Sequence, residues 1–96
     1  MNLKKDYEQK LEAQLDEWKA KIDEFDAKIK KAEADARIEY KKEVEALQQK
    51  YEAAEAKLDE LRKSSESAWQ NLKAGVNSAW DELESAISSA ASKFSQ

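Results

Sequence analysis

The sequence predicts an all-α protein, built as an elongated amphipathic helix or coiled coil. Its 96 residues include no proline, one glycine and 40% charged side chains, so the chain lacks the punctuation of a compact fold of many elements. Alanine, glutamate, lysine and leucine are strong helix formers, and they recur at helical spacing. The bulky apolar residues fall on one side of such a helix. We therefore expect helix along nearly the whole chain and no strand.

One line of residues, which we name the apolar stripe, runs from Leu3 to Phe94 in steps of three or four. Its 25 steps cover 91 residues, a mean between the heptad value of about 3.5 and the eleven-residue value of about 3.67. All eight aromatic residues lie on it, whereas Met1 and Ile38 do not. A stripe this long, with nothing else in the chain to cover it, predicts a partner surface.

Residues 1–63 are expected to form a charged, heptad-dominated coiled-coil rod. Steps of three and four alternate strictly over residues 15–36 and 44–61, which is typical of left-handed coiled-coil packing. Acid-before-base pairs four residues apart, such as Asp59 and Lys63, each add about 0.2–0.5 kcal/mol to a helix. We expect this rod to associate with copies of itself through twelve residues, the self-association seam: Leu11, Leu15, Trp18, Ile22, Phe25, Ile29, Tyr40, Val44, Leu47, Tyr51, Leu58 and Leu61.

Residues 64–96 have a different composition, with all 9 serines but only 2 basic and 4 acidic side chains. Residues 68–78 and 79–89 both begin Ala-Trp, and a third eleven-residue copy starts at Ala90. This repeat predicts an amphipathic helix whose apolar side meets either another helix or a membrane, because large side chains opposite serine resemble helices that sense lipid packing. That apolar side, the C-terminal face, consists of Trp69, Leu72, Val76, Trp80, Leu83, Ile87 and Phe94.

Two places are candidates for a break in the helix. The segment from Ser64 to Ser67 could form a turn, with Ser67 and Gln70 as a capping box. Gly75 costs about 1 kcal/mol inside a helix relative to alanine. A continuous helix would be about 140 Å long, and the alternative is a long helix to about Lys63 with a shorter one folded back. We expect the second arrangement, in an oligomeric bundle.

The chain offers little chemistry for catalysis. It contains no histidine and no cysteine, which removes the usual nucleophile, general base and nitrogen or sulfur metal ligands. Carboxylate pairs such as Asp23 with Asp26, or Asp81 with Glu84, are expected to stay ionised on the surface. We therefore expect no enzymatic activity, no metal, no cofactor and no small-molecule substrate.

Net charge and hydropathy limit the classes of binding partner that we expect. A net charge of −4 argues against nucleic acid, which normally binds a basic surface. We expect no secretory signal, and the sequence has no apolar run of about 20 residues that would span a bilayer. We expect a cytoplasmic protein, with contact to a membrane surface through residues 68–94 as an alternative.

Two segments resemble a known family. Residues 10–18, Lys-Leu-Glu-Ala-Gln-Leu-Asp-Glu-Trp, and the pattern of Ala68-Trp69, Leu72-Lys73, Gly75, Ala79-Trp80 and Leu83 look like the small coiled-coil stress-response proteins of bacteria and cyanobacteria. The resemblance covers nearly the whole chain, and its unusual part is the pair of Ala-Trp motifs eleven residues apart. It implies a cytoplasmic accessory protein associated with stress, and it carries over no catalytic residue.

Three hypotheses for function follow. The leading one is a non-catalytic, self-associating helical protein that acts in stress tolerance as a scaffold or protective coiled coil. The second is a peripheral membrane protein that inserts the C-terminal face into lipid. The third is a chaperone-like holder of unfolded client proteins, which requires the apolar stripe to become exposed.

Overall fold

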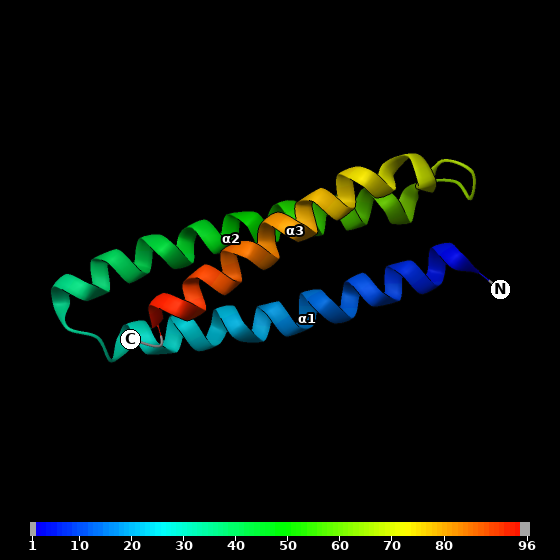
Figure 1. Ribbon diagram of the computed structural model, residues 1–96. Helices are drawn as coiled ribbons and strands as arrows, with labels where there is room; N and C mark the ends of the chain where they lie inside the picture. Colours follow the sequence, from blue (N-terminus) through cyan, green and yellow to red (C-terminus); the bar gives the residue numbers. More distant parts are fainter. Residues whose placement is uncertain (1, 95–96) are drawn as a thin grey trace.

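The computed structural model describes residues 2–94, and it shows three α-helices: α1, Leu3–Lys30; α2, Ala34–Lys63; and α3, Trp69–Phe94. α1 and α3 run in the same direction and α2 runs against both, so the start of α1 lies near the α2–α3 connection (Figure 1). The bundle measures 51 × 19 × 18 Å. The prediction of an elongated all-α protein is confirmed.

α1 begins and ends with recognisable local bonds. Asn2 is extended, and its Oδ1 accepts a hydrogen bond from the Lys5 N–H at 3.0 Å, which satisfies one of the free donors of the first turn. At the other end the N–H groups of Lys31 and Ala32 each donate to a carbonyl three residues back, at 3.1 Å. Such shorter-range bonds tighten the last turn of a helix.

The chain then folds back over Lys31, Ala32 and Glu33, and here the expected single rod over residues 1–63 is wrong. Nothing in these three residues marks a break, because all three are good helix formers. The turn exists because it lets α1 and α2 cover each other's apolar side. In proteins such packing outweighs local helix preference, which amounts to only tenths of a kcal/mol per residue.

The second turn lies where the serines begin, as expected. α2 ends at Lys63, and the Ser64 N–H donates to the Leu61 carbonyl at 3.1 Å. The capping hydroxyl differs from the expected one: Ser65 Oγ, not Ser67, accepts from the Ala68 N–H at 3.1 Å. Gly75 lies within α3 and does not interrupt it.

The three helices bury most of the apolar stripe against one another, so the expectation that nothing in the chain covers it is wrong. Burying each large apolar side chain contributes about 1.5–3 kcal/mol, whereas an exposed ion pair contributes about 0–1 kcal/mol. Among residues 2–94 no polar or charged residue is buried, and the large hydrophobic residues left exposed are Leu3 and Ile38. The core consists of Leu11, Leu15, Ile22, Phe25, Ile29, Val44, Leu47, Ala54, Leu58, Leu61, Trp69, Val76, Trp80, Leu83, Ile87, Ala90 and Phe94.

Candidate functional site

The residues of the self-association seam lie inside the bundle, in contact with other helices of the same chain. Nine of the twelve are buried, and the aromatic members Trp18, Tyr40 and Tyr51 are half-buried at the edge of the core. The structure therefore brings the whole seam together in one place. In this three-helix arrangement, which we call the closed bundle, the seam is not available to a second molecule.

The C-terminal face is also turned inward. Six of its seven residues are buried, and Leu72 is half-buried and packed against the core. α3 packs most extensively on α2 and less on α1. Its outer side carries exposed small polar residues, including Asn71, Ser78, Ser85 and Ser88. Packing against another helix, one of the two expected alternatives, is thus what the closed bundle shows.

Aromatic rings join α1 to α3 at three levels along the bundle, an arrangement we name the ring ladder. Tyr7 faces Trp69 with ring centroids 5.8 Å apart, and Trp18 faces Trp80 at 6.3 Å. At the far end Phe25 stacks on Phe94 at 4.8 Å. The first two pairs stay in register because Tyr7 to Trp18 and Trp69 to Trp80 are both eleven residues, on helices that run in parallel.

The middle pair leaves one polar atom without a partner. Trp80 is 4% exposed, and its indole Nε1 is buried with no hydrogen-bond acceptor. A buried donor left unpaired costs about 1–3 kcal/mol. The closed bundle is therefore less favourable at Trp80 than its apolar packing alone suggests.

Tyr7 combines several interactions at the first level of the ring ladder. Its hydroxyl donates to Asn77 Oδ1. The Lys73 ammonium lies 5.2 Å from the centre of the Tyr7 ring and 5.7 Å from that of Trp69, within reach of a cation–π attraction. Burial raises the pKa of the Tyr7 phenol above its ordinary value. These contacts tie the first turn and a half of α1 to α3.

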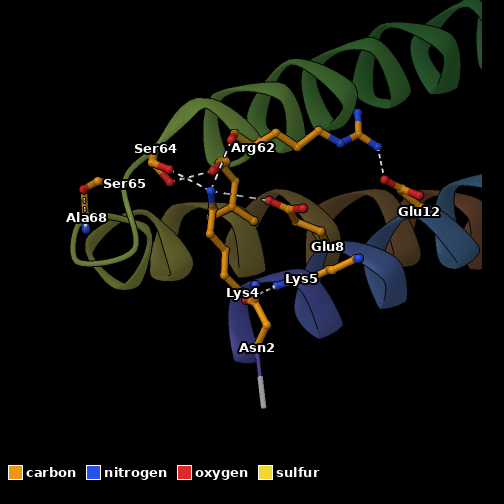
Figure 2. A network of polar contacts seen from close by, with 10 residues as sticks. Asn2, Lys4, Lys5, Glu8, Glu12, Arg62, Ser64, Ser65 and Ala68 are labelled. Atoms are coloured by element: carbon orange, nitrogen blue, oxygen red, sulfur yellow. Dashed lines mark hydrogen bonds and ion pairs between the residues drawn. The ribbon is translucent and has the colours of Figure 1, made fainter.

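A network around Lys4 holds the start of α1 to the end of α2 (Figure 2). Lys4 Nζ donates to the carbonyls of Ser64 at 2.7 Å and Arg62 at 3.1 Å, and lies 3.7 Å from a Glu8 carboxylate oxygen. One turn further on, the Arg62 guanidinium bonds the Glu12 carboxylate. A cation at the C-terminal end of a helix satisfies free carbonyls and complements the helix dipole. Sequence reasoning missed this network, since Lys4 is one of many lysines.

A groove lined largely by acidic side chains lies between α1 and α2. It encloses about 480 Å³, and its wall includes Asp16, Glu55, Asp59 and Tyr51. Burial raises the pKa of Tyr51, and the charges of Glu55, Asp16 and Asp23 raise it further. Within residues 2–94, no three histidine, cysteine or carboxylate side chains are grouped so that they could hold a metal ion.

The helices also differ from membrane-spanning ones. None of the helices in the described part of the chain is both long enough and apolar enough to cross a bilayer.

Comparison with known proteins adds no relative. No protein-family model matches the chain. No curated protein and no solved structure matches it either.

Proposed function

We propose that the protein is a non-catalytic helical bundle that associates with copies of itself and serves stress tolerance as a scaffold or protective coiled coil. One observation carries the proposal: the core is made of helix–helix contacts between apolar side chains, with no polar residue of the described chain buried in it. Buried polar residues are what fix the register and the number of helices in many coiled coils. Without them, the same helix faces can pair between chains as well as within one.

The biological context of the proposal comes from the sequence. The Ala-Trp motifs at Ala68-Trp69 and Ala79-Trp80 resemble those of small coiled-coil stress-response proteins, and the proposal places the protein in the cytoplasm on that basis. In this structure both tryptophans belong to the ring ladder that joins α1 and α3. The motif therefore has a packing role that a self-associated form would reuse.

Sedimentation equilibrium of samples refolded over a wide range of protein concentrations tests self-association. We expect the mass of one chain, 11.0 kDa, in dilute samples and at least twice that mass in concentrated ones, with unchanged helical content by circular dichroism. A mass of 11.0 kDa at every concentration would contradict the proposal.

A second candidate function, binding to a lipid surface through the C-terminal face, is favoured by Trp80. An indole is well suited to the membrane–water interface, where its ring meets hydrocarbon and its N–H finds an acceptor. Moving Trp80 there would relieve its unpaired Nε1. The small polar residues on the outer side of α3 fit a helix that binds by apolar insertion.

Small, highly curved neutral vesicles test this second candidate. We expect the protein to float with the vesicles. Lys93 Nζ on α3 lies 3.0 Å from a Glu43 carboxylate oxygen on α2, far from the serine turn, so a short bismaleimide link between Glu43→Cys and Lys93→Cys holds α3 in place. The linked protein should lose binding, and the unlinked double variant is its control. Equal binding by both, or none by either, would remove the candidate.

A further inference from the structure

The turn between α1 and α2 is built from residues that favour helix. The turn consists of Lys31, Ala32 and Glu33, so it has no glycine or proline. No residue between positions 2 and 94 has a positive φ. Glu33 occupies the N-cap position of α2 but makes no side-chain cap bond. Serine, threonine, aspartate or asparagine normally provides that bond. The local preference of this segment is therefore to continue the helix.

Few contacts hold the turn in its bent form. Lys31 and Glu33 are exposed, and Ala32 is half-buried. A hollow of about 350 Å³ opens beside them, bordered by residues that include Tyr40 and Phe94. One side-chain bond spans the turn, from Arg37 Nη2 to the Ala32 carbonyl at 3.1 Å. Straightening the turn therefore breaks few contacts made by Lys31, Ala32 and Glu33 themselves.

The other turn is better secured. The Ser64 hydroxyl donates to the Leu61 carbonyl in the last turn of α2, and the Ser65 hydroxyl accepts from the Ala68 N–H at 3.1 Å. Because local bonds hold this turn while the first turn lacks a cap, the first is the one expected to open. α3 then stays folded on α2.

The apolar stripe keeps its phase through the first turn. From Phe25 the steps to Ile29, Ala32, Ala36 and Tyr40 are four, three, four and four residues. A helix that continued from Leu3 to Lys63 would therefore keep its apolar residues on one side. Such a helix would be about 90 Å long.

We propose that the chain exchanges α1 with a second copy of itself through the turn at Lys31–Glu33. Each chain forms one long helix from α1 and α2, the two long helices run antiparallel, and α1 of each copy packs on α2 and α3 of the other. The ring ladder, the Lys4 bonds and the Glu12–Arg62 ion pair all form again, now between copies. Exchange of an identical element in this way needs no new interface. The inference rests on the proposed self-association and names its route.

Replacing Ala34 with proline should permit the closed bundle and prevent the dimer in which α1 is exchanged. Ala34 is the first residue of α2, a position that tolerates proline, and Glu33 before it has φ −66° and ψ 157°, the conformation that a residue preceding proline prefers. A continuous helix does not accommodate proline at this point. We expect refolding at high concentration to give a slowly dissociating dimer for the parent chain and for the matched control Ala34→Ser, and loss of that dimer for Ala34→Pro.

Cross-linking between differently labelled chains identifies the exchanged contact. The chain has no cysteine, so Glu12→Cys and Arg62→Cys can be placed on separate chains, refolded together and joined with a short bismaleimide. We expect covalent heterodimers, no covalent dimer from either variant alone, and loss of the link when both carry Ala34→Pro. Glu33→Asp, which supplies the missing cap, is expected to lower the yield without a proline.

The outcomes distinguish exchange from association in general. A dimer that forms without the cross-chain link, or one that persists undiminished in Ala34→Pro and Glu33→Asp, would overturn exchange and leave self-association standing. Absence of any dimer from the parent chain would overturn both.

Discussion

At the scale of single residues, Lys4 connects the first turn of α1 to the end of α2. Its side chain is 13% exposed and bonds the carbonyls of Arg62 and Ser64. Hydrogen bonds from a charged group contribute about 1.5–3 kcal/mol each, so Lys4→Met is expected to lower the free energy of unfolding by about 1–3 kcal/mol. Its exposed neighbour provides the control, since Lys5→Met should change little in urea denaturation. Equal losses in the two variants would show that the network contributes nothing specific.

Tyr7 gives the bundle a dependence on alkaline pH. Burial raises the pKa of its phenol above 10.0, so the folded state holds the proton more tightly than the unfolded state does. The resulting stabilisation is complete below pH 10 and is lost as the pH rises through the folded pKa. As the pH rises above 10, the free energy of unfolding should therefore fall less steeply in Tyr7→Phe than in the parent chain. Urea titrations at several alkaline pH values measure both slopes, and identical slopes would refute the effect.

Individual residues differ in how far sequence could place them. The inward side of each helix was predictable, because apolar periodicity places buried positions such as Leu47 and Leu83 on one line. Lys4 was not, since its partners are backbone carbonyls about 60 positions away that any lysine could reach. The unpaired Nε1 of Trp80 was equally hidden, because it depends on what surrounds the ring in three dimensions.

At the scale of elements, the two turns show what sequence can and cannot reveal. The break at Ser64–Ser67 was predictable because serine hydroxyls compete for backbone groups and favour caps and turns. The break at Lys31–Glu33 was not, because it has no glycine, no proline and no cap bond. It is specified by the burial of α1 on α2, which is a property of the folded chain.

Gly75 provides a test of α3 as a rigid element. It is exposed within the helix, and a Cβ added there would meet no atom within 4 Å. Glycine in a helix is less favourable than alanine by about 0.5–1 kcal/mol, so Gly75→Ala should raise the free energy of unfolding by about that amount. The adjacent exposed position supplies the reverse change, Ala74→Gly, which should lower it similarly. A loss of stability in Gly75→Ala would indicate that α3 needs its glycine.

At the scale of the whole molecule, folding back changes the meaning of the apolar stripe. A single helix of 96 residues would be about 140 Å long and would leave the stripe uncovered, whereas the bundle extends 51 Å and covers it within one chain. The stripe therefore does not require a partner. In our proposal the stripe can still pack against a second copy, because it keeps its phase through a turn that few contacts hold.

The most direct measurement is the distance between spin labels on Glu12→Cys and Arg62→Cys of the same chain, diluted with excess unlabelled protein. In the closed bundle these positions are in contact, since the native side chains form an ion pair. In one continuous helix they are 50 residues apart, or about 75 Å. We expect the short distance alone after refolding in dilute solution, and a second population near 75 Å after refolding in concentrated solution. A short distance alone in both samples would contradict exchange through the turn at Lys31–Glu33.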